Sequence, residues 1–363
     1  MATERKTSKL DFIIVGQGLA GSLLGWRLLQ QGCSVLIVDP CLEQTASRTA
    51  AGLINPITGK RFVKTQHIEE YLPAAKQLYG ELAAFFSEEF WHGMQQVTLF
   101  QSKDDIEQWQ KRRNEPDYKP YLGAQFSADS KAYLCEESAG GFEQKQCGYL
   151  DTVLLLDTLR EHFQALGCFT KQHLNMDELT VGESSTQWQG YHAKKIIFCD
   201  GFQLQNNHWF AWLPLQPAQG EIFTLKTNKQ LSEEIVHFGK WLLPLKNGQF
   251  RLGSTWQWKP LDEQPAAKSA SELMHALEQQ FPELSDAQLI EKKVGVRPGT
   301  RDKLPFLGSH PYHPSLSVFN GFGSKGALMI PWYAECFCHY LTKGLSLPEF
   351  ADIKRYANDC PSC

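Results

Sequence analysis

The stretch that decides the fold spans residues 12–39 and reads FIIVGQGLAGSLLGWRLLQQGCSVLIVD. It contains two short apolar runs, 12–15 and 35–38, which are typical of buried parallel strands. Between them, apolar residues recur at helical spacing from Leu19 to Gln31, and a glycine follows where a helix would end. Two parallel strands joined by a helix form a βαβ unit, so the stretch predicts an α/β domain.

Three glycines stand where the first strand meets the helix, in the pattern G-x-G-x-x-G. Gly16 permits a tight turn, Gly18 lets a pyrophosphate approach the backbone, and Gly21 allows the helix to pack closely on the strand. Leu19 and Ala20 then begin a helix whose N-terminal N–H groups can face the phosphates. This order of strand, turn and helix predicts a dinucleotide site.

An acidic residue, Asp39, ends the second strand about 20 residues after the glycines, where a carboxylate can bind a ribose hydroxyl. Pro40 follows it in the same expected site. A carboxylate here disfavours the 2′-phosphate of NADP, which leaves FAD or NAD. The next stretch, 46–56, reads ASRTAAGLINP; its small residues would let the chain lie close against a flat ring, although the same composition fits an ordinary loop.

The length and composition exclude several classes of protein. With 363 residues, of which 42% are hydrophobic and 21% charged, the chain is long enough for two domains with buried cores. The net charge of -4 disfavours a protein held to nucleic acid mainly by charge. No apolar run is long enough to span a bilayer and the N-terminus lacks the apolar core of a secretory signal. We therefore expect no membrane association and a cytoplasmic protein whose ten cysteines are mostly reduced.

The domain organisation follows from where each pattern occurs. Patterns of α/β type occur at the start, around 146–205 and at the end, whereas 215–258 alternates like antiparallel strands and turns at Asn247-Gly248. We predict an α/β fold, α+β overall, in which a Rossmann-type dinucleotide-binding domain is interleaved with a substrate domain built on an antiparallel sheet. The predicted dinucleotide-binding ranges are 1–65, 146–205 and 290–363, and the substrate ranges are 66–145 and 206–289.

Three separated segments resemble one known family. They are the glycine-rich stretch, the stretch that follows Ser47, and the segment from Gly295 onward, which reads GVRPGTRDKLPFLGSHP and then, from Asn320, NGFGSKGALMIPWYAE. Together they are similar to the glycine oxidase / D-amino acid oxidase family of FAD-dependent amine oxidases. The last segment is the most specific of the three, and the resemblance covers roughly half of the chain.

The resemblance implies a bound FAD whose ADP part lies on the first βαβ unit. It further implies that the flavin ring lies near two loops and a strand end, and these carry the remaining predicted cofactor residues: Ser47, Arg48, Ala50, Ala51, Gly52, Leu53, Gly201, Gly321, Phe322, Gly323, Ser324, Lys325 and Gly326. The turn after Gly321 leads into a helix, whose N-terminus would stabilise negative charge on the reduced ring. Some relatives tether the flavin through a cysteine after the arginine motif; 298–305 has none, so we expect noncovalent FAD.

The resemblance also identifies Arg297 as the residue that binds the substrate carboxylate. A guanidinium can hold a carboxylate through two parallel, charge-assisted hydrogen bonds, which fixes the substrate's orientation. The alternative is a structural arginine paired with Asp302 or with a helix C-terminal carbonyl, and Arg301 with Asp302 is a second candidate for such a pair. Ser324-Lys325 departs from the polar group that glycine oxidase-type relatives often carry at this turn.

The function implied is FAD-dependent oxidation of a carboxylate-bearing primary or secondary amine, such as glycine, sarcosine or a D-amino acid. A hydride would pass to flavin N5, and O₂ would reoxidise the flavin to give H₂O₂. The last segment is also similar to the FAD-dependent domain of the bifunctional enzyme that matures 5-methylaminomethyl-2-thiouridine in tRNA, although the acidic balance gives RNA binding little support. A nicotinamide-dependent dehydrogenase and a non-catalytic flavin-binding protein remain alternatives from other classes.

Other reactive residue types have simpler explanations. Cys336, Cys338 and His339 do not share one helix face well, so we expect packing and no metal site. The C-x-x-C pair at Cys360 and Cys363 lacks the context of a redox motif. The basic run 111–113 is a solvated surface or, with an RNA substrate, a phosphate contact.

Overall fold

The computed structural model describes residues 8–127, 140–258, 261 and 267–361. The chain divides into two compact units that each draw on separated segments. The first unit is Met1–Arg48, Thr152–Ala218 and Val296–Cys363, and the second is Thr49–Asp151 and Gln219–Gly295. These bounds differ from the ranges that we predicted, because 49–65, 146–151 and 290–295 group with the second unit and 206–218 with the first.

The first unit contains the predicted βαβ start. β1 (Ser8–Val15) and β2 (Val35–Asp39) pair in parallel, joined by α1 (Leu19–Gln30). β1 also pairs in parallel with β14 (Tyr191–Phe198), which pairs in parallel with β21 (Leu316–Asn320). Within the described residues the sheet has eight strands. The other members are β11 (Phe169–Lys171), β12 (Leu179–Val181), β13 (Thr186–Trp188) and β20 (Phe306–Ser309).

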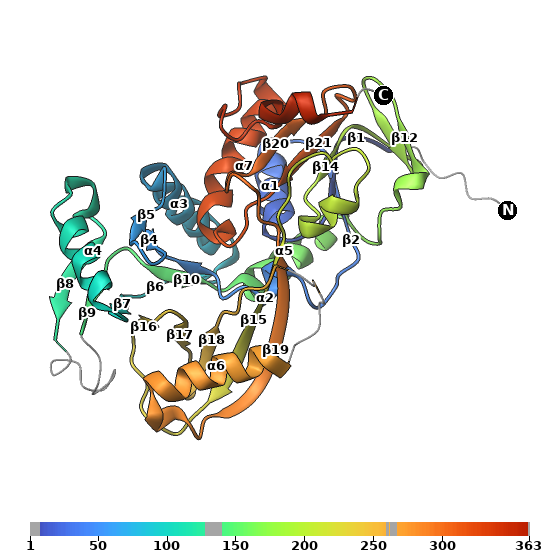
Figure 1. The fold of residues 1–363 in the computed structure, drawn as a ribbon. Helices are drawn as coiled ribbons and strands as arrows, with labels where there is room; N and C mark the ends of the chain where they lie inside the picture. The colour runs from blue at the N-terminus through green and yellow to red at the C-terminus, as the bar shows by residue number, and fades with distance from the viewer. Residues whose placement is uncertain (1–7, 128–139, 259–260, 262–266, 362–363) are drawn as a thin grey trace. The chain divides into compact units, whose positions relative to one another are not determined.

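Helices cover the parallel part of this sheet. α1 packs against α7 (Gly326–Lys343) and α5 (Thr152–Ala165), as Figure 1 shows for α1 and α7. An ion pair between Arg27 Nε and Glu335 Oε2, 3.1 Å long, joins α1 to α7. The apolar parts of these strands, 12–14 in β1, 35–38 in β2 and 196–198 in β14, are buried, as is typical of parallel strands that helices cover.

The second unit is built on an antiparallel sheet, which has eight strands among the described residues. In sheet order its strands are β19 (Gln288–Arg297), β15 (Ala218–Lys226), β18 (Gln249–Gly253), β17 (Trp241–Pro244), β16 (Ile235–His237), β7 (Gln96–Leu99), β9 (Gly141–Gln144) and β8 (Leu122–Phe126). β17 and β18 form the predicted hairpin at Asn247-Gly248. β16 pairs with β7 in parallel, whereas the pairs β15–β18, β16–β17, β17–β18, β7–β9 and β8–β9 are antiparallel.

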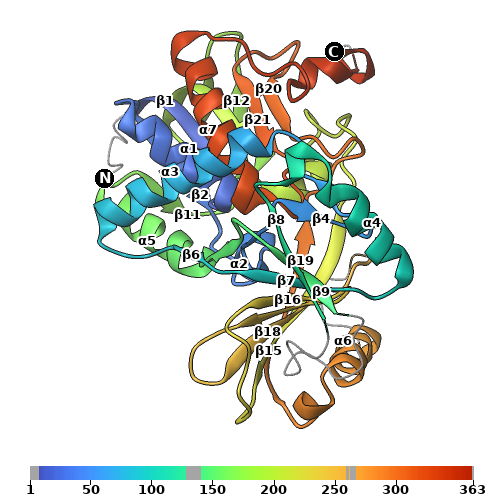
Figure 2. The same ribbon diagram turned by 90° about the vertical axis from the view of Figure 1, so that its left-hand side faces the viewer.

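One face of the antiparallel sheet packs against α6 (Ala267–Gln280), which Figure 2 shows beside the sheet. Phe223, Phe250 and Leu252 point to this side and are fully buried with Leu273 and Leu277 of the helix. The unit also contains α2 (Ala46–Thr49, which straddles the two units), β3 (Leu53–Ile54), β4 (Ile57–Thr58), β5 (Val63–Lys64), α3 (Ile68–Phe86), β6 (Trp91–Gly93), α4 (Lys103–Arg113) and β10 (Gly148–Leu150). A search of the described residues finds no helix with the length and apolar character that crossing a bilayer requires.

Candidate functional site

The predicted dinucleotide residues gather at one edge of the parallel sheet. The order β2, β1, β14, β21 places the carboxyl ends of these strands side by side. Asp39 ends β2, Gly16 follows β1, Gly201 comes shortly after β14, and Gly321 follows β21. Ligands of open parallel sheets bind at this edge. The fold therefore brings together, within the first unit, glycines that are 305 positions apart in the sequence.

The glycine turn has no room for side chains. Gly16 has φ +100°, and a Cβ there would lie 2.7 Å from the carbonyl oxygen of Cys199. A Cβ on Gly21 would lie 1.9 Å from the carbonyl oxygen of Gly16. Both distances are shorter than van der Waals contact, so the turn can form only with glycine at these positions. This agrees with the roles that the pattern predicts for Gly16 and Gly21.

Two predicted side chains are hydrogen-bonded at this turn. The backbone N–H of Leu19, at the start of α1, donates to Ser47 Oγ over 3.0 Å. The carboxylate of Asp39 accepts from the N–H of Gln17 at 2.7 Å and from that of Cys41 at 2.6 Å. These bonds fix the carboxylate at the end of β2, where its remaining lone pairs can accept from a ribose hydroxyl.

A network that sequence reasoning missed supports the turn from α5. The side chain of Gln17 is 3% exposed; its amide donates to Ser22 Oγ and to the carbonyl of Leu156, and it accepts from Arg160 Nε at 2.7 Å. Buried amides need such partners, because an unpaired polar group is costly. A residue at an x position of the G-x-G-x-x-G pattern is usually treated as free to vary, so the pattern carries no signal of this role.

The side chain of Arg48 is fixed by an ion pair. Its guanidinium forms a two-bond pair with the carboxylate of Asp157 in α5, at 2.5 and 3.2 Å. Arg48, Arg160 and Lys171 all act electrostatically on Cys41, which follows the second strand. Three cationic side chains and the carboxylate of Asp39 thus act on the end of β2, and two of the cations also contact Asp157.

Asp200 and Asn320 are two further site residues that the sequence did not single out. Asn320 Nδ2 donates to Asp200 Oδ1 at 3.1 Å and to the carbonyl of Gly201 at 3.0 Å, while its own Oδ1 accepts from the N–H of Gly321. One side chain thus links two of the predicted glycines. Burial raises the pKa of Asp200 to about 7. The available signal was that each residue directly precedes a predicted cofactor glycine.

Arg297 and the turn before α7 are neighbours within the first unit. The N–H of Gly323 donates to the carbonyl of Pro298 at 3.1 Å, and a Cβ on Gly321 would meet Thr300 Cγ2 at 2.8 Å. Burial lowers the pKa of Arg297 to about 10, so the guanidinium remains charged at neutral pH. Burial, with a smaller effect of Lys303, lowers the pKa of Lys325 to about 8.

The structure overturns the expected structural pairs around Asp302. Its carboxylate binds Arg355 Nε at 2.9 Å and the hydroxyl of Tyr356 at 2.7 Å. Arg301 is exposed and Arg297 is not the partner, so the predicted Arg301–Asp302 pair is wrong. The reason is that a distant short helix, 353–359, folds back over this segment. Ser324 is exposed, Phe322 is buried, and Gly326 begins α7.

The loop from Ala50 to Leu53 belongs to the second unit. Gly52 has φ +69°, and a Cβ there would lie 2.0 Å from the carbonyl oxygen of Leu150. The N–H of Leu150 in turn donates to the carbonyl of Gly52. Ala51 packs with buried residues of the antiparallel sheet. The close approach of β10 explains why the loop is built of small residues, and its contact with a flavin stays a prediction.

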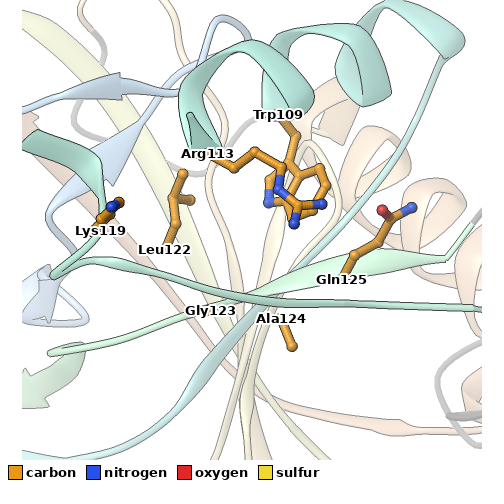
Figure 3. A pocket seen from close by; sticks show the side chains of 7 residues that line it. All are labelled: Trp109, Arg113, Lys119, Leu122, Gly123, Ala124 and Gln125. Atoms are coloured by element: carbon orange, nitrogen blue, oxygen red, sulfur yellow. The ribbon is translucent and has the colours of Figure 1, made fainter. Parts of the chain in front are cut away.

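A separate hollow of about 400 Å³ lies between α4 and β8 in the second unit, and Figure 3 shows the residues that line it. None of the predicted cofactor or substrate residues is among them. Arg113 stacks over the ring of Trp109 at 4.6 Å, and Arg112 pairs with Glu115. Two members of the basic run 111–113 therefore have local structural partners. On the last helix, His339 pairs with Glu335, and Cys338 is buried; Cys363 lies outside the described residues.

The donor set of the first unit fits a dinucleotide of the FAD type. A turn that excludes side chains and an oriented carboxylate at the end of β2 suit a pyrophosphate and its ribose. These features define a dinucleotide-binding protein of the doubly wound class. A model of the family described as FAD dependent oxidoreductase matches residues 11–340. The chain therefore belongs to the FAD-dependent oxidoreductase family, which identifies the dinucleotide as FAD.

Two curated relatives are similar to this chain in sequence. The glycine oxidase of Pseudomonas putida is 27% identical over 131 residues, which is 36% of each chain. The bifunctional tRNA 5-methylaminomethyl-2-thiouridine biosynthesis protein of Marinobacter nauticus is 22% identical over 355 residues, covering 89% of this chain and 54% of that protein. The chain thus spans between about a third and about half of the length of these relatives.

Solved structures agree on the fold. The glycine oxidase of Geobacillus kaustophilus superposes with a TM-score of 0.83 at 19% identity, covering 97% of this chain and 98% of the other. At that identity the likeness concerns the fold. It confirms the expected α/β architecture of an FAD-binding domain interleaved with antiparallel strands.

Proposed function

We propose that this protein oxidises a small primary or secondary amine that carries a carboxylate, such as glycine, sarcosine or a D-amino acid, in the cytoplasm. The observation that supports this most is Arg297, a half-buried and charged guanidinium at the end of β19, next to the turn that opens α7. FAD, bound noncovalently, would supply the redox chemistry, which is hydride acceptance at N5 from the substrate α-carbon and reoxidation by O₂ with formation of H₂O₂. Free thiols on the eight described cysteines support a reducing compartment.

The chain's own residues supply binding and orientation in this proposal. Arg297 holds the carboxylate by two parallel hydrogen bonds, so that the α-carbon is presented in one orientation. Partial burial makes each of these bonds stronger than it would be in water. The glycine turn and Asp39 hold the dinucleotide, and the N-terminus of α7 faces negative charge that develops on reduction. No side chain is needed as a general base if the amine reacts as its neutral form.

The experiment is an anaerobic screen of glycine, sarcosine, proline and D-amino acids against the FAD-loaded protein. We expect at least one of them to bleach the flavin absorbance, and admission of O₂ to restore it with formation of H₂O₂. A yellow protein that none of these amines bleaches would contradict the proposal and favour a non-catalytic flavoprotein. A protein that fails to bind FAD yet binds NADH would favour a nicotinamide-dependent dehydrogenase.

A second candidate is oxidation of a modified wobble uridine in tRNA. One observation favours it: the match to the bifunctional tRNA-modifying protein extends over 89% of this chain, further than the match to the glycine oxidase of Pseudomonas putida. Arg113 and Lys119 line the hollow beside α4, and their side chains can donate hydrogen bonds to RNA phosphates. A gel-shift titration with tRNA at low salt tests it. Retarded tRNA that is released by salt supports this candidate, and no shift at low salt contradicts it.

A further inference from the structure

Asp200 lies at the edge of the parallel sheet where the predicted dinucleotide residues gather. It directly follows β14, which pairs with β1 on one side and with β21 on the other. A Cβ on Gly16 would lie 3.2 Å from Asp200 Cα, so Asp200 borders the glycine turn. Asn320, which ends β21, donates to Asp200 Oδ1 at 3.1 Å. All three residues belong to the first unit.

The carboxyl group of Asp200 has hydrogen-bond donors beside it but no cation. The donors are Asn320 and its own backbone N–H, and within the described ranges of the chain the carboxyl forms no ion pair. A carboxyl that is shielded from water without a compensating cation favours its neutral form. Burial, opposed by these two hydrogen bonds, accordingly raises the pKa of Asp200 to about 7.

Few other groups around Asp200 can carry a charge. Cys199 is a buried thiol whose pKa is raised by burial and further by the charge of Asp200, so the thiol stays protonated near neutral pH. The first turn of α1, the short helix 201–206 and the turn 320–324 contain no ionisable residue. Burial and Lys303 lower the pKa of Lys325, which precedes α7, to about 8. Among these groups, Asp200 titrates nearest to pH 7.

FAD brings further negative charge to this edge. Its pyrophosphate is expected on the glycine turn, which borders Asp200. Like charges in a partly buried site repel each other, and a carboxylate escapes the repulsion by taking up a proton. The neutral acid can also donate a hydrogen bond, which a carboxylate cannot. Both effects favour protonated Asp200 in the FAD complex.

We propose that FAD binds to the form of the protein in which Asp200 is protonated, so that a molecule whose Asp200 is ionised takes up one proton from the solvent on binding. The inference concerns the loading of the cofactor and holds whichever amine is oxidised. Most molecules of the FAD-free protein are protonated at Asp200 at pH 6 and most are ionised at pH 8. The affinity for FAD should therefore fall as the pH rises through 7, and Asp200 should account for an about tenfold larger dissociation constant at pH 8 than at pH 6.

Isothermal titration calorimetry counts the proton. FAD is titrated into the FAD-free full chain in two buffers that differ in ionisation enthalpy, HEPES and Tris at pH 8 or MES and imidazole at pH 6. The difference in binding enthalpy between the buffers gives the number of protons taken up. No group of free FAD titrates between these pH values. We expect Asp200 to account for close to one proton per FAD at pH 8 and about a tenth of a proton at pH 6.

Three variants assign this proton. Asp200→Asn keeps the shape of the side chain but cannot titrate, so it should take up about one proton less than the wild type at pH 8 and should lose the tenfold change in affinity. Asp302→Asn is the matched control: in spite of burial, hydrogen bonds from Arg355 and Tyr356 lower the pKa of that carboxyl, so it is ionised throughout and its loss should leave the uptake unchanged. Lys325→Gln removes the group that titrates next above Asp200 and should still take up the proton.

Three outcomes would overturn the proposal. They are equal proton uptake by the wild type and Asp200→Asn at pH 8, a pH dependence of the affinity that Asp200→Asn leaves unchanged, and loss of the uptake in Lys325→Gln. If Asp200→Asn does not fold, Lys325→Gln provides the test. Its uptake must then rise from about a tenth of a proton at pH 6 to close to one at pH 8, and equal uptake at both pH values would contradict the proposal.

Discussion

The two units present their functional side chains in different ways. In the first unit the carboxyl ends of parallel strands lie next to each other, so short turns that follow separate strands meet at one edge of the sheet. Each of these turns is set by its own local sequence. In the second unit the side chains of interest lie along antiparallel strands, and which of them share a face depends on strand register.

This difference predicts where substitutions do harm. Gly16 and Gly21 in the turn of the first unit have contacts shorter than a side chain allows, whereas Gly80 in a helix of the second unit is exposed and has free space around it. Arg48 of the first unit pairs with Asp157 next to the candidate site, whereas Lys240 of the second unit pairs with Glu272 of α6 at the surface. Four experiments test this contrast.

The largest effect should come from Gly21→Ala. A Cβ there would lie 1.9 Å from the carbonyl oxygen of Gly16, so the turn must shift. We expect FAD affinity to fall on the order of 100-fold, which corresponds to a cost of about 2–3 kcal/mol. The quenching of flavin fluorescence on binding measures it.

The control for this change is Gly80→Ala in α3, where a Cβ meets nothing within 4 Å. It should raise the free energy of unfolding by about 1 kcal/mol because alanine favours the helix, and it should leave FAD binding unchanged. Equal FAD affinity in Gly21→Ala and Gly80→Ala would contradict the expectation that only the glycine turn of the first unit is needed for FAD binding.

Arg297→Lys should come next in size. A lysine keeps the charge but replaces two parallel hydrogen bonds by a point contact, so carboxylate substrates should bind about 10–100-fold more weakly. FAD affinity should stay the same. Arg301→Lys, in the exposed neighbouring turn, is the matched control and should behave as the wild type. A parallel fall in FAD and substrate affinity would show that Arg297 has a structural role.

The pH dependence of stability should reflect Asp200. Its pKa is raised from 3.8 to about 7 in the folded chain, so folding favours the protonated form. The stability that this provides is complete below pH 4 and is lost as the pH rises through 7. Urea unfolding at pH 5 and pH 8 should show that Asp200→Asn loses about 2–3 kcal/mol less stability than the wild type over this interval. If the wild type and Asp200→Asn lost the same free energy of unfolding between pH 5 and pH 8, the pKa of Asp200 would not be raised by folding.

The smallest effects concern ion pairs. Asp157→Asn releases Arg48 from its two-bond pair, and we expect FAD affinity to fall by a few-fold. Glu272→Gln breaks the pair with Lys240 in the second unit and should change the free energy of unfolding by less than about 1 kcal/mol, with no effect on FAD. If Glu272→Gln weakened FAD as much as Asp157→Asn does, the network around Arg48 would have no special role.

The success of sequence reasoning differs between elements for physical reasons. The βαβ start and the hairpin at Asn247-Gly248 are confirmed because short-range sequence dictates both. The strands β8 and β9 fell within a segment that reads only as polar, because β8 is an edge strand with exposed residues. Asp302 was paired with the wrong partner because Arg355 is more than 50 residues away along the chain.

The glycine pattern, the acid that ends the second strand and the arginine motif were readable from the sequence alone, because each depends on backbone geometry or chemistry within a few residues. The tertiary structure decided what no window of sequence contains: that Asn320 joins Asp200 to the turn before α7, that Gln17 is anchored to α5, and that Ala51 packs with Ile222 and Leu243 of the antiparallel sheet. Such neighbours are set by strand order and register, which the whole chain determines together.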